Sequence, residues 1–163
     1  MAETLTIDPN ASKAAQYQAL YPQLKGLVTG EPNFTANVAN VMAALKQSFG
    51  WLWVGCYFVD GDTLVLGPFQ GPVACTRLFP GKGVCAAAWE RNAPVVVEDV
   101  DAFPGHVACS SASRSEVVLP IRGGQGEVIG VLDVDSDQLA AFDATDAAEL
   151  LKVADLIGAC HDA

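Results

Sequence analysis

Long hydrophobic runs are absent from this sequence, although 51% of its 163 residues are hydrophobic. The longest unbroken apolar stretch, residues 84–89, is far shorter than the roughly 18 residues that suggest a membrane-spanning helix. The first residues also lack the basic and apolar segments of a secretory signal. We therefore expect a cytoplasmic protein without a membrane partner, folded as one domain over residues 1–163 with its core at about 17–158.

Basic residues are scarce. The chain has 9 Lys and Arg against 19 Asp and Glu, which gives a formal net charge of -10, and its basic residues form no run. Proteins that bind nucleic acid obtain much of their affinity from clustered positive charge. The composition therefore argues against a nucleic-acid partner.

Common metal-binding and hydrolase motifs are also missing. The five cysteines include no C-x-x-C pair, which argues against a zinc knuckle and a thioredoxin-type motif. No G-x-S-x-G sequence occurs, and Gly81-Lys82-Gly83-Val84 lacks the upstream glycine and the following Ser or Thr of a P-loop. Serine hydrolysis and nucleotide hydrolysis are excluded. In a reducing compartment the cysteines are then either buried and inert, or reactive.

Helical periodicity occurs in three segments. Residues 17–28 carry apolar side chains at helical spacing, and Pro22 is expected to kink or interrupt them. Residues 34–49 form the clearest helix, between an N-cap at Asn33 and a stop at Gly50. Asp143 caps a final amphipathic helix.

Alternating patterns predict the strands. Residues 51–60 place Trp51, Trp53, Gly55, Tyr57 and Val59 on one face, and a turn at Gly61-Asp62 leads into a strand at 63–66. A turn at Gly67-Pro68 opens a Gly- and Pro-rich region of loops over residues 67–115. Short strands at 75–78 and 95–98, a short helix at 84–90 and longer strands at 116–121 and 127–135 complete the pattern, which predicts an α+β fold on a mainly antiparallel sheet.

Two aromatic residues on the first strand are a candidate binding site. Trp53 and Tyr57 share one face with Gly55 between them, and their Cα atoms should lie about 13 Å apart. The missing side chain at Gly55 would leave a gap that a small ligand could fill. The alternative is that both rings pack as ordinary core.

A second candidate site consists of carboxylates. Asp133 and Asp135 lie two positions apart on a strand, so both point to one sheet face, and Glu116 joins them if its strand is a neighbour. Like charges this close require a cation, a donor or a shared proton. The cluster would hold an ammonium group or supply a proton; the alternatives are a solvated strand end, or a metal site that includes His106.

A third candidate is a cysteine in a loop. Cys109 lies among small residues, near His106, Arg114 and exposed backbone amides, a setting that lowers the pKa of a thiol. Cys56, inside a strand, and Cys160, in the last helix, are instead typical of small buried hydrophobic residues.

Several short motifs together resemble one known family, the free methionine-(R)-sulfoxide reductases, which are stand-alone GAF domains. The similarity extends from about residue 17 to 142, and the turn at 122–126 is about one residue longer than the family's. That difference should not change the register of Asp133 and Asp135, which their own strand sets. The motifs are Gly67-Pro68-Phe69-Gln70-Gly71, Ala74-Cys75, Gly81-Lys82-Gly83-Val84-Cys85, Val97-Glu98-Asp99-Val100, Gly105-His106-Val107-Ala108-Cys109, Ser115-Glu116-Val117-Val118-Leu119-Pro120 and Gly130-Val131-Leu132-Asp133-Val134-Asp135-Ser136.

The resemblance implies a fold and a redox cycle. The N- and C-terminal helices would cover one side of the sheet, and the short helix and active-site loops the other. Cys109 would attack the sulfur of free methionine-(R)-sulfoxide and become a sulfenic acid. Cys75 would resolve this acid as a disulfide, Cys85 would be a third cysteine able to join the exchange, and thioredoxin would reduce the disulfide without any cofactor.

The same resemblance implies how the substrate binds. Trp53 and Tyr57 would enclose its methyl group and side chain, and Asp133 would help to bind its ammonium. Glu116 and Asp135 would be the catalytic carboxylates, because sulfoxide oxygen leaves only when protonated. Backbone amides of the loop from Ser110 to Ser113 would receive its carboxylate.

Two other functions remain alternatives. A non-catalytic GAF module would sense a small ligand or dimerise, and it would need no linked thiols. A peroxide-reducing thiol enzyme would use the same cysteines without the pocket of Trp53 and Tyr57. The sequence leaves open whether the chain forms a homodimer.

Overall fold

The computed structural model describes residues 4–107 and 109–162, so Ala108, part of one motif above, lies outside the described residues. Within these residues no helix combines the length and the apolar character needed to span a bilayer. The helices are α1 (Lys13–Val28), α2 (Phe34–Phe49), α3 (Gly83–Arg91), a 3₁₀ turn (Val100–Ala102) and α4 (Ala144–His161). The strands are β1 (Trp53–Asp60), β2 (Thr63–Gln70), β3 (Arg77–Leu78), β4 (Val95–Val97), β5 (Ser115–Arg122) and β6 (Val128–Ser136).

The strands form one sheet in the order β3-β2-β1-β6-β5-β4, and each neighbouring pair is antiparallel. Asp135 of β6 lies opposite both Trp53 of β1 and Glu116 of β5. Asp133 lies opposite Gly55. Because directly paired residues share a face, the register alone brings the predicted aromatic and acidic residues together.

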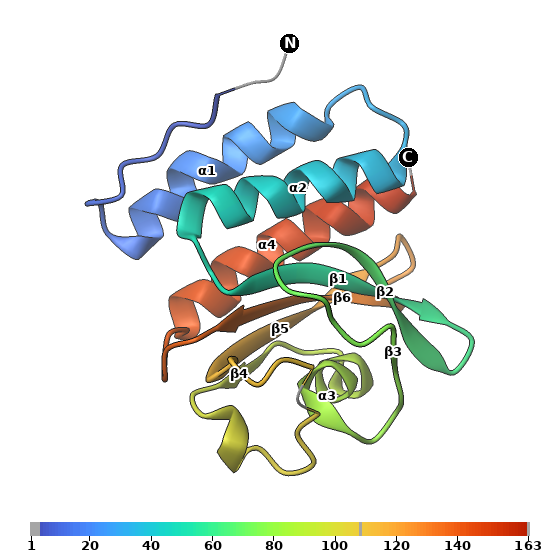
Figure 1. Ribbon diagram of the computed structural model, residues 1–163. Helices are drawn as coiled ribbons and strands as arrows, with labels where there is room; N and C mark the ends of the chain where they lie inside the picture. Colours follow the sequence, from blue (N-terminus) through green and yellow to red (C-terminus); the bar gives the residue numbers. More distant parts are fainter. Residues whose placement is uncertain (1–3, 108, 163) are drawn as a thin grey trace.

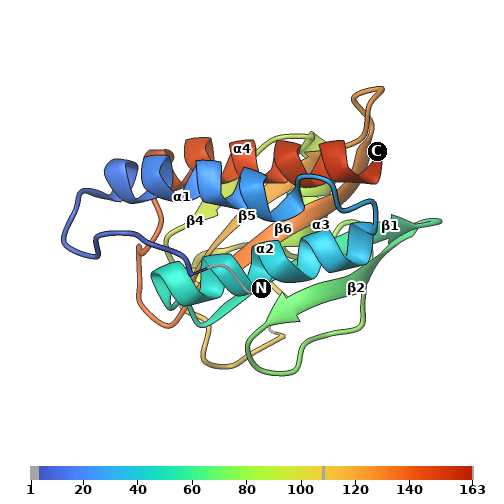
Figure 2. The ribbon, with the colours of Figure 1, turned by 90° about the horizontal axis from the view of Figure 1, so that it is seen from above.

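Helices α1, α2 and α4 cover one face of the sheet, and α3 lies on the other (Figures 1 and 2). Alternate residues of the central strands, among them Val54, Leu132 and Val134, are buried in the core under the three helices. Their neighbours Trp53, Tyr57 and Val131 belong to a second core on the α3 side. The predicted α+β fold, with these helices on opposite sides, is confirmed.

Two predicted interruptions do not occur. Of the two effects expected at Pro22, a kink or an interruption, the interruption is absent: α1 continues through the proline, because Tyr17, Leu20 and Leu24 on either side of it are buried and hold the helix in place. β2 continues to Gln70 instead of turning at Gly67-Pro68. The β1–β2 register shifts there, so the missing N–H of Pro68 breaks no ladder bond.

Smaller corrections concern the ends of the strands. Trp51 does not share a face with Trp53, because β1 begins only at Trp53 and the alternation does not extend to residue 51. Its ring stacks on Phe49 at 4.4 Å between centroids, in the core under the helices. The strand expected at 75–78 has only two residues, Arg77–Leu78, which leaves Cys75 in a loop.

A buried carboxylate joins the first and last helices. Asp146, only 2% exposed, accepts hydrogen bonds from the Tyr17 hydroxyl at 2.6 Å and the Lys13 ammonium at 2.5 Å. It also accepts the backbone N–H of Asp143, whose own side chain caps α4. One side chain therefore satisfies a helix terminus and two groups of α1.

We predict that Asp146→Ala lowers the free energy of unfolding by about 3 kcal/mol, because it leaves the buried Tyr17 hydroxyl without its acceptor and removes the shortest of the hydrogen bonds that the Lys13 ammonium makes. Urea denaturation measures the change. Asp155→Ala is the matched control: this α4 carboxylate is 57% exposed and lies 3.9 Å from Arg122, so its loss should cost less than about 1 kcal/mol. Equal losses in the two variants would contradict the structural role of Asp146.

Candidate active site

The α3 side of the sheet contains a cavity with about 560 Å³ of empty space, including its open mouth. We call it the sheet pocket. Its lining includes two cysteines of the resembled redox set, both predicted aromatic residues and all three predicted carboxylates. The lining residues are Trp53, Tyr57, Val73, Ala74, Leu78, Lys82, Gly83, Val84, Cys85, His106, Val107, Cys109, Ser110, Ser113, Glu116, Asp133 and Asp135.

The aromatic wall is packed more tightly than the sequence predicts. The rings of Trp53 and Tyr57 stack with their centroids 5.9 Å apart, and Trp53 also stacks on Phe69 at 5.3 Å. The expected gap over Gly55 does not exist, because the Trp53 ring covers it: a Cβ on Gly55 would lie 2.8 Å from Trp53 Cζ3. The two rings are therefore part of the core and part of the pocket wall.

Hydrogen bonds anchor these rings to the loop that follows β2. The Trp53 indole N–H donates to the carbonyl of Pro72 at 3.1 Å. The Tyr57 hydroxyl donates to the carbonyl of Cys75 at 3.0 Å. The aromatic wall thus positions the backbone of the loop that carries Cys75.

The three carboxyl groups are crowded and largely dehydrated. Burial raises the pKa of Glu116 and Asp133 well above their ordinary values, and the negative charges of their neighbours raise both further. Burial also raises the pKa of Asp135 to about 6, although the Ser113 hydroxyl donates to its Oδ1 at 2.6 Å and opposes the shift. The cluster therefore retains a proton at neutral pH.

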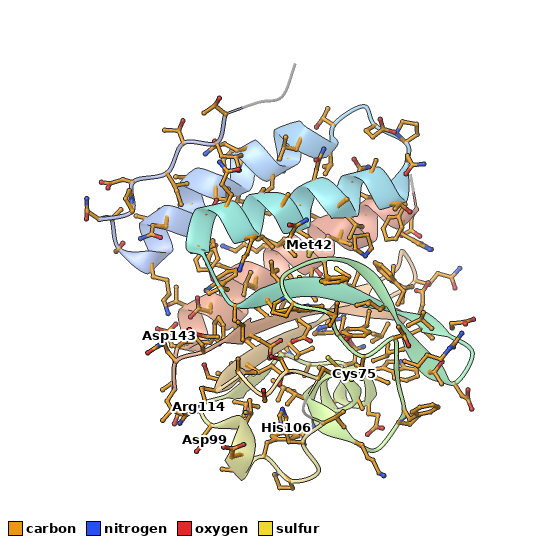
Figure 3. The ribbon with its side chains drawn as sticks, viewed as in Figure 1. Met42, Cys75, Asp99, His106, Arg114 and Asp143 are labelled. Carbon is orange, nitrogen blue, oxygen red and sulfur yellow. A yellow bond between two sulfur atoms is a disulfide. The ribbon has the colours of Figure 1, made fainter. Side chains whose placement is uncertain are left out.

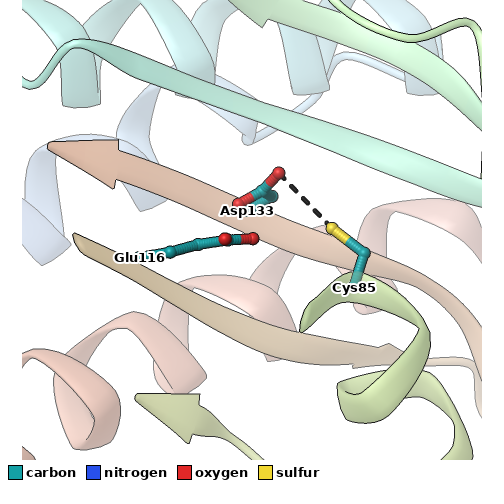
Figure 4. A group of neighbouring side chains, drawn as sticks. All are labelled: Cys85, Glu116 and Asp133. Atoms are coloured by element: carbon teal, nitrogen blue, oxygen red, sulfur yellow. Dashed lines mark hydrogen bonds between the residues drawn. The ribbon is translucent and has the colours of Figure 1, made fainter. Parts of the chain in front are cut away.

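Asp133 has an incompletely satisfied carboxylate. The Cys85 thiol donates to its Oδ2 at 3.4 Å (Figure 4). Its Oδ1 is buried and receives no hydrogen bond from a donor group of the described residues. His106 is the nearest imidazole, with its Nε2 3.8 Å from Glu116 Oε2. The charge at Oδ1 must therefore be met by a proton shared within the cluster or by a bound cation.

Cys75 and Cys109 form a disulfide. They are 34 residues apart in the chain, and the structure brings their Cα atoms to 5.4 Å. Figure 3 shows Cys75 and His106 on the α3 side of the sheet. Both cysteines are partly exposed, whereas Cys85, in the first turn of α3, is a buried free thiol whose pKa is raised, chiefly by burial. The sulfur chemistry is thus at the wall of the sheet pocket.

The other two cysteines lie elsewhere: Cys56 is buried, as the sequence predicts, whereas Cys160 is only partly buried. Cys56 is fully buried in the core under the helices, where its thiol lies 3.9 Å from the sulfur of Met42, and burial raises its pKa. Cys160 is near the end of α4. Neither lines the sheet pocket.

Some of the polar groups in the loop from Ser110 to Ser113 form hydrogen bonds within the loop itself. The Ser110 hydroxyl accepts the N–H of Ala112, and the Ser110 carbonyl accepts the N–H of Ser113. In the described part of the chain, the backbone N–H groups of Ser110 and Ser111 donate no hydrogen bond. Two of the predicted amide donors are thus available to a ligand.

The start of α3 also lines the pocket, which the sequence patterns did not predict. Lys82, Gly83 and Val84 line it, and the Gly83 N–H donates to the carbonyl of Gly105 at 2.9 Å. Gly83 has a φ of 82°, and a Cβ there would lie 3.3 Å from Val107. The paired glycines on either side of Lys82, just before a helix, were the available signal for this close approach.

Known proteins resemble this chain over nearly its whole length. The GAF domain family matches residues 32–160. The chain is 54% identical to "GAF domain-containing protein A" of Dictyostelium discoideum, over 96% of this chain and 99% of that one. It is 44% identical to the "Free methionine-R-sulfoxide reductase" of Escherichia coli, over 80% and 79%. The structure of a free methionine-R-sulfoxide reductase from Neisseria meningitidis, in complex with its substrate, has a TM-score of 0.90 at 51% identity and covers 96% and 95% of the two chains.

The raised pKa of Asp135 predicts a pH-dependent stability. A carboxyl whose folded pKa exceeds its unfolded value stabilises the fold at low pH, and this contribution is lost as pH rises from about 4 through about 6. In the unmodified protein the free energy of unfolding should therefore fall as the pH rises from about 5 to about 7.5. In Asp135→Asn this fall should be smaller by about 1 to 3 kcal/mol. Urea denaturation at constant ionic strength measures it.

Asp137→Asn is the matched control for this experiment, because it removes the same charge from an exposed residue two positions further on. It should leave the difference between the two pH values nearly unchanged. If both variants show the same pH dependence as the unmodified protein, Asp135 is not the group responsible.

Proposed function

The chain belongs to the GAF-domain family of the free methionine-R-sulfoxide reductases, and we propose that it reduces free methionine-(R)-sulfoxide to methionine in the sheet pocket. The observation that carries the proposal is the Cys75–Cys109 disulfide beside three buried carboxyl groups. This arrangement places a thiol pair that can accept an oxygen beside carboxyl groups that can donate a proton. A ligand-sensing module needs neither.

Cys109 acts as the nucleophile. Its thiolate attacks the sulfur of the sulfoxide, the oxygen passes to Cys109 Sγ, and methionine leaves. The product on the protein is a sulfenic acid. The Cys75 thiol then attacks this sulfur and expels water, which gives the disulfide. The Cys75–Cys109 bond supports Cys75 as the resolving thiol, and Cys85 is available for later exchange.

The carboxyl cluster supplies the proton. Protonation weakens the S–O bond, and general acid catalysis of this type contributes roughly 10²–10⁴-fold. Glu116 and Asp135 are the acids, because burial raises the pKa of Asp135 to about 6 and raises the pKa of Glu116 well above its ordinary value. The Ser113 hydroxyl orients Asp135 by its hydrogen bond.

The charged ends of the amino acid explain why the free form is the substrate. Asp133 Oδ1, which has no donor among the described residues, accepts the ammonium. The amide of Ser110 receives the carboxylate, and Lys82, which also lines the pocket, adds a positive charge. A methionine sulfoxide within a peptide has no ammonium, so it would leave the acidic cluster unpaired. Trp53 and Tyr57 contact the S-methyl group.

Electrons reach the disulfide from thioredoxin. A thiolate of the reduced partner attacks the Cys75–Cys109 bond, and its second thiol releases the mixed disulfide, so two electrons and two protons return to the pocket. The cycle uses thiols alone and requires no cofactor.

We predict that NADPH oxidation, coupled through thioredoxin and its reductase, occurs with free methionine-(R)-sulfoxide. The (S)-sulfoxide and an N-blocked (R)-sulfoxide should give less than about a hundredth of that rate, because one misplaces the oxygen and the other lacks the ammonium. Hydrogen peroxide is a fourth substrate in the comparison. Turnover of peroxide alone would favour a peroxide-reducing enzyme, and no turnover with any substrate would favour a ligand-binding module.

Single-turnover experiments test the roles of the cysteines. Cys109→Ser should form no methionine, because the nucleophile is lost. Cys75→Ser should form about one methionine per chain and then stop, because the sulfenic acid cannot become a disulfide. Cys160→Ser, which changes a cysteine outside the pocket, is the control with full activity. Equal single-turnover yields from Cys109→Ser and Cys75→Ser would contradict the assignment.

A further inference from the structure

Three buried side chains in the sheet pocket form a group with the composition of a metal site. Atoms of Cys85, Glu116 and Asp133 that can bind a metal all lie within 4.8 Å of one another (Figure 4). The thiol comes from α3, and the carboxylates come from the adjacent strands β5 and β6. Three separate elements of the fold thus direct ligands at one point.

A second observation points to a cation at this place. Oδ1 of Asp133 is buried within the group, and no donor of the described residues reaches it. Asp133 as a whole is 6% exposed. A carboxylate oxygen in this position is satisfied either by a proton shared with Glu116 or by a bound cation, and a cation that displaces this proton would meet both carboxylates at once.

The distances fit a tetrahedral zinc ion. Zn–S bonds of about 2.3 Å and Zn–O bonds of about 2.0 Å place sulfur and oxygen about 3.5 Å apart in a tetrahedron. Cys85 Sγ and Asp133 Oδ2 are already 3.4 Å apart. Glu116 would supply the third ligand and water from the pocket the fourth. A thiolate ligand favours zinc or cobalt over magnesium or calcium.

We propose that this group binds Zn²⁺, through Cys85 Sγ and carboxylate oxygens of Asp133 and Glu116, and that the bound ion excludes the sulfoxide substrate. Binding releases the thiol proton and the proton held by the carboxyl cluster to solvent. The ion then occupies the place of the substrate's ammonium. Binding itself does not depend on the proposed reductase activity, whereas the inhibition rests on it.

The binding experiment uses the full chain with Cys75→Ser and Cys109→Ser, so that the disulfide-forming thiols cannot compete for metal. Zinc affinity is measured against a chromophoric chelator, and Co²⁺ serves as a spectroscopic probe. We expect one ion per chain and a near-ultraviolet thiolate-to-cobalt charge-transfer band. Adding Cys85→Ser should abolish the band, and adding Asp133→Asn should weaken zinc binding about tenfold or more.

Cys160→Ser in the same background is the matched control and should leave the band and the zinc affinity unchanged. Circular dichroism verifies that each variant is folded. A band that survives Cys85→Ser, or a zinc affinity that neither Cys85→Ser nor Asp133→Asn lowers, would overturn the site.

The inhibition experiment uses the Cys75→Ser protein under single-turnover conditions, so that neither thioredoxin nor the Cys75–Cys109 thiol pair is present to bind zinc. Zn²⁺ should raise the sulfoxide concentration needed for half-maximal rate and leave the maximal rate unchanged. Mg²⁺ at the same concentration should have no effect. Zinc inhibition that excess substrate does not relieve would overturn the overlap of the two sites. A protein that binds zinc but forms no methionine would contradict the proposed function and leave the metal site intact.

Discussion

The crowding of three carboxyl groups on one face of an antiparallel sheet is the constraint on which the pocket depends. Glu116 and Asp135 are directly opposite each other, and Asp133 lies two positions along the same strand. Charged side chains this close and this buried oppose folding unless they share protons or meet a cation. The site is therefore prepared for a ligand that brings a positive charge and an oxygen that needs a proton.

Apolar packing on the opposite face of the sheet offsets the unfavourable burial of these carboxyl groups. Helices α1, α2 and α4 bury the alternate residues of the same strands, so the strands are held in register by ordinary apolar packing. Asp146 illustrates the contrast between the two sides: it is also a buried carboxylate, yet the Lys13 ammonium, the Tyr17 hydroxyl and a backbone amide satisfy it. The carboxyl groups of the pocket have weaker partners, the Ser113 hydroxyl at Asp135 and the Cys85 thiol at Asp133, and incompletely satisfied acids of this kind are typical of functional sites.

Local patterns in the sequence were sufficient for most of the fold. The helix from Phe34 to Phe49 has its predicted cap and stop, because both are set by nearest neighbours in the chain. Local rules failed at Pro22 and Pro68, where packing in α1 and a register shift in β2 offset the missing N–H groups. They also failed at Gly55, because no local pattern shows that the Trp53 ring folds back over it.

The sequence by itself determined the types of residue available for chemistry and their faces: alternation places Asp133 and Asp135 on one side of a strand whatever its neighbours are. Only the tertiary structure decided which strands are neighbours, and hence that Glu116 joins them. It also decided that Cys75 meets Cys109 across 34 residues. Contacts between distant segments depend on how loops close and how layers pack. Local patterns of neighbouring residues predict neither of these.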